Sequence, residues 1–322
     1  MSQPTDKILE GIRQRSRVSI ARAISLVENE QPEADRILRS IYASTGKGYR
    51  IGITGPPGAG KSTITNKLAK FYRGKKLAVG IIAVDPTSPF TGGALLGDRV
   101  RMTDVELDEG VFIRSMASRG SLGGLSKKAG EAADILDAAG YDIVLMETVG
   151  VGQSELDIVR AADTTVVVLV PESGDSIQAM KAGLMEIADF FVVNKADRPG
   201  AEQAVMSVKM ILNFRSTKND WHPDVIQSVA QEGQGIDAIA DMVARHRAHM
   251  EQHSVLLQKR RQRIMDRVRE LIGEQLHNDF WTQEREHLLQ TRIHTVLQHG
   301  MTPYDLAESL LHDFSVHHEE ST

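Results

Sequence analysis

The sequence predicts an α/β protein whose mostly parallel, doubly wound sheet is preceded and followed along the chain by helical segments. Short, continuous apolar runs rich in Val and Ile alternate with helical patterns between residues 49 and 250. Such runs are typical of strands that are buried on both faces of a parallel sheet. Outside this part only helical periodicity is found. We therefore expect an N-terminal helical segment at 1–48, a central domain at 49–250 and a C-terminal helical extension at 251–322.

Each expected element follows from its apolar pattern. Strands are expected at 51–54, 77–84, 111–115, 143–147, 165–170, 190–194 and 225–229. The helical periodicity of residues 6–44 is broken at Gln31-Pro32, which predicts two helices, and the glycines of 45–48 predict a hinge after them. Beyond the sheet, helices are expected at 255–280, 284–298 and 304–311.

Composition narrows the class of protein. The chain has 322 residues, of which 41% are hydrophobic, so it can bury a sizeable core. It contains no cysteine, which excludes disulfides and thiolate metal sites and fits a reducing cytosol. Its formal net charge of -5 argues against nucleic acid as a partner. No apolar run has the length of a membrane span and the N-terminus lacks a signal-type core, so we expect a soluble, cytoplasmic protein without a membrane partner.

One motif organises the central domain. It is a phosphate-binding loop (P-loop) made of Gly55, Pro56, Pro57, Gly58, Ala59, Gly60, Lys61 and Ser62 and followed by Thr63. Because the motif lies between an expected strand and an expected helix, its backbone N–H groups can surround phosphates, with Lys61 as the catalytic cation and Ser62 as a Mg²⁺ ligand. An ordinary glycine turn is the alternative. The full motif in this context predicts a P-loop NTPase.

A second motif follows the expected strand at 143–147. That strand ends in Glu147, whose carboxylate can hold Mg²⁺, and the N–H of Gly150 can approach a γ-phosphate. A strand-end acid that faces solvent is the alternative. Many GTPases place a water-orienting glutamine where this chain has Val151, so we expect slow intrinsic hydrolysis. Gln153 is close enough along the chain to substitute.

Asn194, Lys195 and Asp197 follow another expected strand and are typical of a guanine-reading motif. The Asp197 carboxylate would accept hydrogen bonds from guanine that adenine cannot donate, and the Lys195 stem would cover the base. Backbone amides at the end of the next strand could close the base pocket; these belong to Ser228, Val229 and Ala230.

Two aspartates lie between these motifs. Asp85 ends a strand at the same sheet edge as the P-loop, so it could reach the metal or the attacking water. Asp98 lies in a glycine-rich stretch with the composition of a mobile switch, although a solvated loop acid is the alternative. Downstream, the spacing of His246, His249 and His253 can ligate a metal, but a solvated polar helix face explains it better because no carboxylate or cysteine completes the set.

With these residues in view, the chain resembles the MeaB/ArgK family of P-loop GTPases, chaperones of adenosylcobalamin-dependent acyl-CoA mutases. The resemblance rests on GITGPPGAGKST at 52–63, VDPTSP at 84–89, LLGDR at 95–99, METVGVGQSE at 146–155, SGDSIQAMKAG at 173–183 and NKADRPGA at 194–201. It implies that GTP or GDP binds with Mg²⁺. It also implies that Asp85, Asp98 and Glu147 surround the metal.

The resemblance further implies two partners. One is the mutase, reached through an additional switch at 173–183 that includes Asp175, Gln178 and Lys181. The other is a second copy of the chain, because the family dimerises through the matching C-terminal helices. An apolar stripe there supports a homodimer or packing onto the chain's own core; it consists of Leu257, Ile264, Val268, Leu271 and Ile272.

The function expected is that of a regulatory GTPase that gates delivery of adenosylcobalamin to a mutase and protects it. A nickel or cobalt metallochaperone GTPase is one alternative, although it would call for a metal-relay cluster such as C-x-x-C and the chain has no cysteine. A small-molecule kinase is another, and the guanine motif argues against it.

Overall fold

The computed structural model describes residues 4–86, 105, 107–118, 124–148, 160–171, 182–213 and 221–319. It forms two compact units, Met1–Arg260 and Arg261–Thr322, and the boundary falls inside helix α12 (Val255–Phe280). The three-part division expected from the sequence stays a prediction.

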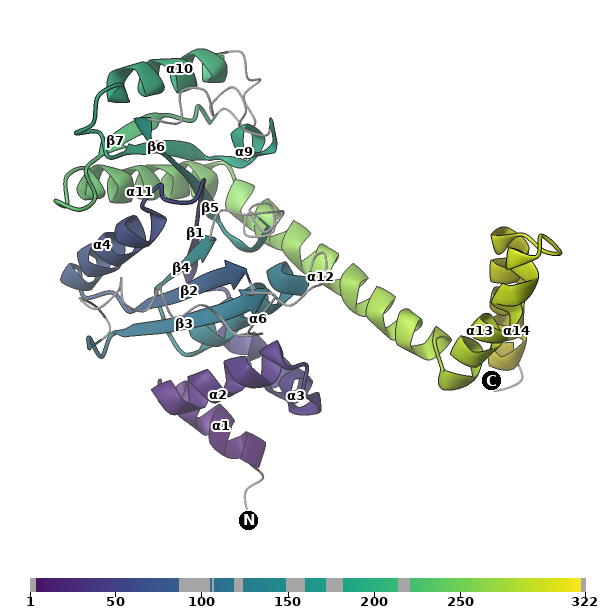
Figure 1. The fold of residues 1–322 in the computed structure, drawn as a ribbon. Helices are drawn as coiled ribbons and strands as arrows, with labels where there is room; N and C mark the ends of the chain where they lie inside the picture. Colours follow the sequence, from purple (N-terminus) through teal and green to yellow (C-terminus); the bar gives the residue numbers. More distant parts are fainter. Residues whose placement is uncertain are drawn as a thin grey trace. The chain divides into compact units, whose positions relative to one another are not determined.

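In the described residues, seven strands form one sheet in the order β3-β2-β4-β1-β5-β6-β7, and every pair is parallel (Figure 1). The strands are β1 (Tyr49–Thr54), β2 (Val79–Pro86), β3 (Val111–Ser118), β4 (Ile143–Thr148), β5 (Thr164–Leu169), β6 (Phe190–Asn194) and β7 (Val225–Ser228). Each overlaps a strand that the apolar runs predict. The α/β fold class is therefore confirmed, with β1 at the centre of the sheet.

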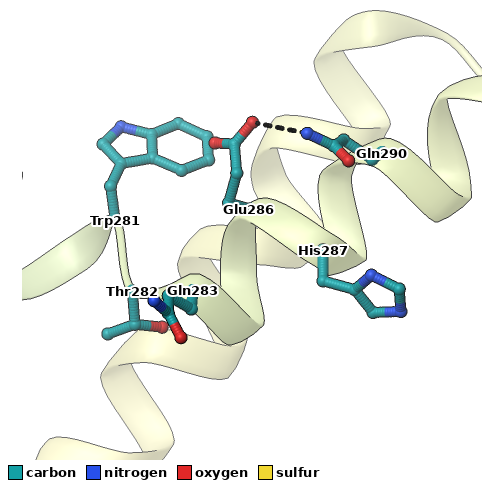
Figure 2. Close-up of a pocket in the computed structure, with 6 residues that line it drawn as sticks. All are labelled: Trp281, Thr282, Gln283, Glu286, His287 and Gln290. Atoms are coloured by element: carbon teal, nitrogen blue, oxygen red, sulfur yellow. Dashed lines mark hydrogen bonds between the residues drawn. The ribbon is translucent and has the colours of Figure 1, made fainter.

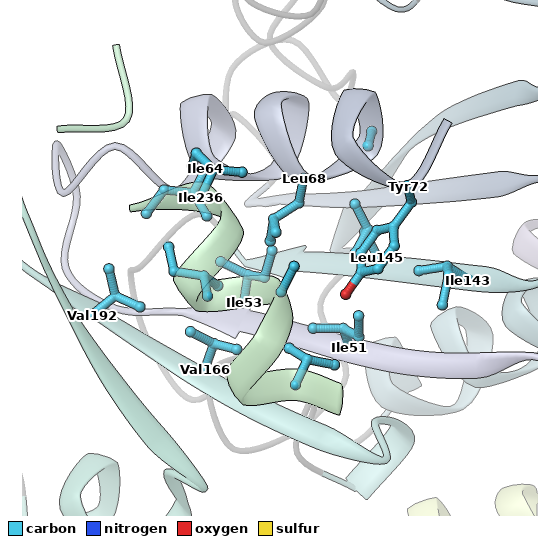
Figure 3. Close-up of a cluster of buried hydrophobic side chains, with 14 of the residues drawn as sticks. Ile51, Ile53, Ile64, Leu68, Tyr72, Ile143, Leu145, Val166, Val192 and Ile236 are labelled. Atoms are coloured by element: carbon cyan, nitrogen blue, oxygen red, sulfur yellow. The ribbon is translucent and has the colours of Figure 1, made fainter. Parts of the chain in front are cut away.

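Helices cover both faces of the sheet. Among the described residues of the first unit after residue 60, the helices that precede α12 are α4 (Lys61–Gly74), α6 (Gly124–Ala138), α9 (Ala182–Ile187), α10 (Ala201–Asn213) and α11 (Ile236–Gln252). Alternate residues of β4 face opposite layers: Leu145 packs in the cluster under α4 and α11, and Met146 packs in the cluster under α6. Figure 3 shows the first of these clusters, with Leu68 of α4 and Ile236 of α11 over Ile53 of β1. The core is thus two apolar layers separated by the sheet.

The N-terminal segment differs from the prediction of two helices. Residues 4–44 form α1 (Pro4–Arg13), α2 (Arg17–Glu28), α3 (Pro32–Ile41) and a short 3-10 helix, Tyr42–Ser44. The missed break lies at Arg15, which has a φ of 56°, and Ser16, which caps α2 by accepting from the N–H of Ser19. Ile12 and Ile20 on the two sides of the break are both buried, so apolar periodicity continues across it and hides the turn.

The segment at 45–48, expected to be a hinge, is held by one carboxylate. The buried Asp137 of α6 accepts from the N–H groups of Gly46 at 2.6 Å, Lys47 at 3.2 Å and Gly48 at 2.8 Å. Three successive backbone donors around one carboxylate are a strong anchor. The segment therefore fixes the entry to β1.

The second unit is helical. It contains most of α12, α13 (Gln283–Leu297) and α14 (Pro303–Glu319), which ends later than the predicted 311. A hollow of about 460 Å³ lies at the turn between α12 and α13 (Figure 2); it is lined by Trp281, Thr282, Gln283, Glu286, His287 and Gln290. None of these is a residue that the sequence predicts for nucleotide binding. Within the part of the chain that the structure describes, no helix combines the length and apolar character needed to cross a membrane.

Candidate nucleotide-binding site

The P-loop joins the end of β1 to the start of α4, as the motif predicts. Gly55 has a φ of 136°, and a Cβ there would lie 2.1 Å from the carbonyl oxygen of Val168 in β5. A Cβ at Gly60, which has a φ of 88°, would lie 2.3 Å from Asn194 Nδ2, whereas one at Gly58, which has a φ of 75°, would meet no atom of the described residues within 4 Å. Only glycine tolerates these conformations at these distances. Among the described residues, the loop is therefore closely packed at Gly55 and Gly60 and open at Gly58.

Lys61 is the first residue of α4 and is buried. Its Nζ donates to the carbonyl oxygens of Gly55 at 2.8 Å and Pro56 at 2.9 Å, so the ammonium group lies against the loop. An ammonium group has three donors and a full charge, which suits it to bind phosphate oxygens in the loop. The helix N-terminus adds its own partial positive charge there.

Two of the four groups expected to hold magnesium are in direct contact. Ser62 Oγ donates to Glu147 Oε1 at 2.5 Å, and the Glu147 side chain is buried. The contact follows from the sheet order, because Ile53 of β1 pairs with Glu147 of β4. A hydroxyl and a carboxylate are the oxygen ligands that Mg²⁺ prefers, so the residues present fit this ion.

A buried pair of threonines supports this arrangement. Thr148 Oγ1, at the end of β4, donates to Thr54 Oγ1, at the end of β1, over 2.9 Å. The bond joins the residue after Glu147 to the residue before the P-loop. Sequence reasoning missed it, because two threonines 94 positions apart carry no local signal.

Most of the other residues predicted to act near the phosphates lie outside the described part of the chain. Asp85 lies at the same edge, since Val84 pairs with Thr148, but its side chain is outside the described part of the chain. Asp98, Gly150, Val151 and Gln153 also lie outside the described residues, as do Asp175, Gln178 and Lys181.

Asn194 links the P-loop to the residues that are predicted to bind the base. Its Nδ2 donates to the carbonyl oxygen of Ala59 in the P-loop at 2.9 Å. Its Oδ1 accepts from Ser228 Oγ and from the N–H of Ala230, each at 3.1 Å. The side chain therefore ties the phosphate loop to the segment after β7.

The base-side residues surround this link. Lys195 has a φ of 60°, and the next residue, Ala196, donates its N–H to the carbonyl oxygen of Ser228 at 3.0 Å. Asp197 is exposed and can meet a base from solvent. The N–H of Val229 donates to the carbonyl oxygen of Gln234, so this amide and that of Ala230 are bonded to protein acceptors.

The sequence suggested that His246, His249 and His253 form a solvated helix face. His246 differs from this prediction. His246 is buried, with Nδ1 2.8 Å from Thr164 Oγ1 and Nε2 3.5 Å from Asp189 Oδ1, and the ring of Trp221 packs on it at 4.7 Å. Burial lowers the pKa of His246 below its ordinary value, although Asp189 opposes the shift. Among the described residues, no group of three or more His, Asp or Glu is arranged to hold a metal ion.

Comparisons with known proteins give the family context. A family model described as methylmalonyl Co-A mutase-associated GTPase MeaB matches residues 20–285. A Pyrococcus horikoshii protein is 47% identical over 312 residues, which is 96% of this chain and 98% of its own. GTPase ArgK of Escherichia coli is 37% identical over 281 residues, or 85% of each chain.

Two further relatives extend the comparison. The mitochondrial methylmalonic aciduria type A homolog of Mus musculus is 32% identical over 335 residues, which is 97% of this chain and 80% of its own. A crystal structure described as an LAO/AO transport system kinase has a TM-score of 0.73 at 28% identity and covers 98% of this chain and 99% of its own.

Proposed function

Because the chain belongs to the MeaB family of mutase-associated GTPases, and is itself a GTPase that binds GTP and GDP, we propose that its hydrolysis of GTP serves a partner enzyme. The partner is an adenosylcobalamin-dependent acyl-CoA mutase, and the GTPase gates cobalamin delivery to it and protects it. The observation that carries this proposal is the family match over 20–285, a range that includes the entire P-loop, Glu147 and the guanine motif.

The chain's own residues account for hydrolysis in three parts. Loop amides and Lys61 bind and neutralise the phosphates, which is where phosphoryl transfer needs stabilisation. Ser62 and Glu147 would hold Mg²⁺, which when bound supplies further neutralising charge. Asn194 keeps the base-binding segment at a fixed distance from the phosphate loop, so one nucleotide can contact both.

Slow turnover by the isolated protein is part of the proposal. Val151 has no group that can orient water, so the rate should stay near the order of 1 per minute or below, as in GTPases that lack assistance. A bound protein could complete or reposition the catalytic set, which would make hydrolysis report on docking.

The experiment is to measure the GTPase rate with and without the cognate mutase. Wild type should be accelerated, and Lys181→Ala should be accelerated less while its affinity for GTP is unchanged, because Lys181 is the proposed coupling residue. Lys209→Ala, which removes a half-exposed lysine of α10, is the matched control and should behave as wild type. Equal acceleration in all three removes Lys181 from the proposal, and no acceleration in any of them contradicts the mutase role.

We also propose that the chain forms a homodimer through its C-terminal helices. Large apolar side chains of α12 are exposed, among them Ile264 at 50%, Val268 at 48% and Leu271 at 44%. Exposed apolar stripes of this length mark interfaces. Light scattering on full-length Ile264→Glu combined with Leu271→Glu should show a monomer, whereas Gln258→Glu on the same helix should remain a dimer. A dimeric double variant would refute the assignment.

A further inference from the structure

A charged cluster lies at the edge of the sheet where the strands begin, opposite to the P-loop. Its cation is Arg260 of α12 and its carboxylate is Asp163, which immediately precedes β5 and is fully buried. Arg260 Nη2 lies 2.8 Å from Asp163 Oδ2, and Nε lies 3.3 Å from Oδ1. This is the bidentate geometry that arginine forms with carboxylates. The nucleotide site does not use the pair.

The pair is bonded to the start of β1 on two sides. Arg260 Nη1 donates to the carbonyl oxygen of Gly46 at 2.6 Å, and Nη2 donates to that of Gly48 at 3.0 Å. Asp163 Oδ2 accepts from the N–H of Arg50 at 3.1 Å. Because Asp137 binds the N–H groups of 46–48, both polar sides of this segment are held.

The pair also holds the start of β5. The N–H of Asp163 donates to the carbonyl oxygen of Arg50 at 2.8 Å, and Lys259 Nζ donates to the carbonyl oxygen of Asp163 at 2.9 Å. Burial alone would lower the pKa of Arg260, but the hydrogen bond and charge of Asp163 outweigh it and the pKa is raised. Arg260 therefore keeps its charge, and β1 and β5 begin from one fixed point.

Both strands lead to the P-loop. β1 continues from Thr54 directly into Gly55, and the carbonyl oxygen of Val168 in β5 is the atom that Gly55 packs against. The two strands are buried along their whole length and pair from Ile51 with Thr164 to Thr54 with Val167. A strand of this length spans about 20 Å, and a close-packed interior transmits small displacements over it.

We infer that Arg260 is a positioning residue of the GTP site. By fixing where β1 and β5 begin, it sets how the P-loop lies against Val168, and so the geometry in which the loop amides meet phosphate. The link is reciprocal: nucleotide bound in the loop stabilises the bonds at the strand starts. The inference depends on GTP binding and not on the proposed mutase.

If Arg260 had a purely structural role, different results would be expected, and two variants can distinguish that role from positioning of the loop. Arg260→Met leaves the Asp163 carboxylate buried with its bidentate partner removed, which destabilises the fold strongly. Combining it with Asp163→Asn removes both charges, and such neutral replacements recover much of the stability. If Arg260 only stabilises the fold, nucleotide binding recovers together with stability. If it positions the loop, binding stays weak in the double variant.

The experiment measures the thermal midpoint, the Kd for a fluorescent GDP and the kcat and KM for GTP. The variants are Arg260→Met, Arg260→Met with Asp163→Asn, and Arg260→Lys, which keeps the charge but loses the planar fork. Arg261→Met, at the exposed neighbouring position, is the control. We expect GDP to bind roughly 3- to 30-fold more weakly in the double variant and in Arg260→Lys, with KM changed more than kcat.

Hydrogen exchange supplies the second readout. GDP should slow exchange of the amides of 46–50 in wild type and in Arg261→Met, but not in Arg260→Lys. Wild-type GDP affinity in Arg260→Lys or in the double variant overturns the inference. The inference is also overturned if GDP slows exchange of these amides in Arg260→Lys as much as it does in wild type. If Arg260→Met fails to fold, the other two variants decide.

Discussion

The two edges of the one parallel sheet carry similar polar side chains in different surroundings. At the edge where the strands end, Lys61, Ser62 and Asn194 hold a loop that no described residue covers at Gly58. At the edge where the strands begin, Asp163 and His246 are buried and bonded to other protein groups. One edge holds the loop that is predicted to bind phosphate, and the other holds the starts of the strands that lead to it.

Burial accounts for the different roles of the polar groups at the two edges. The carbonyl oxygens that bind Lys61 belong to the loop that is predicted to bind phosphate. Loss of the lysine should therefore weaken nucleotide binding more than it destabilises the fold. The groups around Asp163 bind one another and lie far from the predicted phosphate site. Loss of one partner there should therefore first lower the free energy of unfolding, by on the order of 3–5 kcal/mol for a broken buried pair. Three substitutions test this contrast.

The largest effect is expected for Lys61→Ala. The change removes the cation that lies against the P-loop, and loss of one such stabilising donor typically lowers kcat roughly 10²- to 10³-fold. GTP turnover and nucleotide affinity measure it. Lys70→Ala, at an exposed position of the same helix, should leave both unchanged. A Lys61→Ala protein that is unstable but hydrolyses GTP normally would reverse the contrast between the edges.

A smaller effect, and one on specificity, is expected for Asp197→Asn. The exposed carboxylate is the predicted acceptor for guanine, and an amide in its place offers a donor instead. A hydrogen bond to a charged group is worth about 1.5–3 kcal/mol, so affinity for GTP should fall roughly 10- to 100-fold while xanthine nucleotides gain. Competition binding with GTP, xanthosine triphosphate and ATP checks this. Retained preference for GTP would place base reading elsewhere.

The smallest effect is expected at His246, and it concerns stability against pH. Its pKa is lowered in the folded protein, mainly by burial, whereas the unfolded chain has a pKa near about 6.5. Between these two values only the unfolded chain binds the proton, so stability present above about pH 6.5 is lost as the pH falls, with a slope of at most about 1.4 kcal/mol per pH unit.

Urea denaturation of wild type and His246→Gln at about pH 7.5 and about pH 5.5 measures this term. The variant should lose less stability on acidification than wild type. His253→Gln, at an exposed position on the same segment, should keep the wild-type difference. Equal loss in wild type and His246→Gln would show that other groups carry the acid dependence.

The sequence was informative wherever a local pattern carried the signal. Continuous apolar runs predicted the strands, with β6 correct at both ends. The P-loop motif predicted a strand before it and a helix after it, and the observed helix α4 begins at Lys61. The sequence was less informative where one helix ends and another begins while the apolar periodicity continues. The break at Arg15 was missed for that reason, because the buried Ile12 and Ile20 continue one apolar pattern.

The fold class and the residue types at the ends of the strands could be predicted from the sequence, because both depend on near neighbours along the chain. Which distant groups meet could be seen in the folded structure alone. Asn194 reaches Ala59 across 135 positions, and Arg260 reaches Asp163 across 97. The first pair exists because the strand order β1-β5-β6 brings the end of β6 near the loop after β1, and the second because α12 passes the start of β5. Burial then requires each polar group to find a partner.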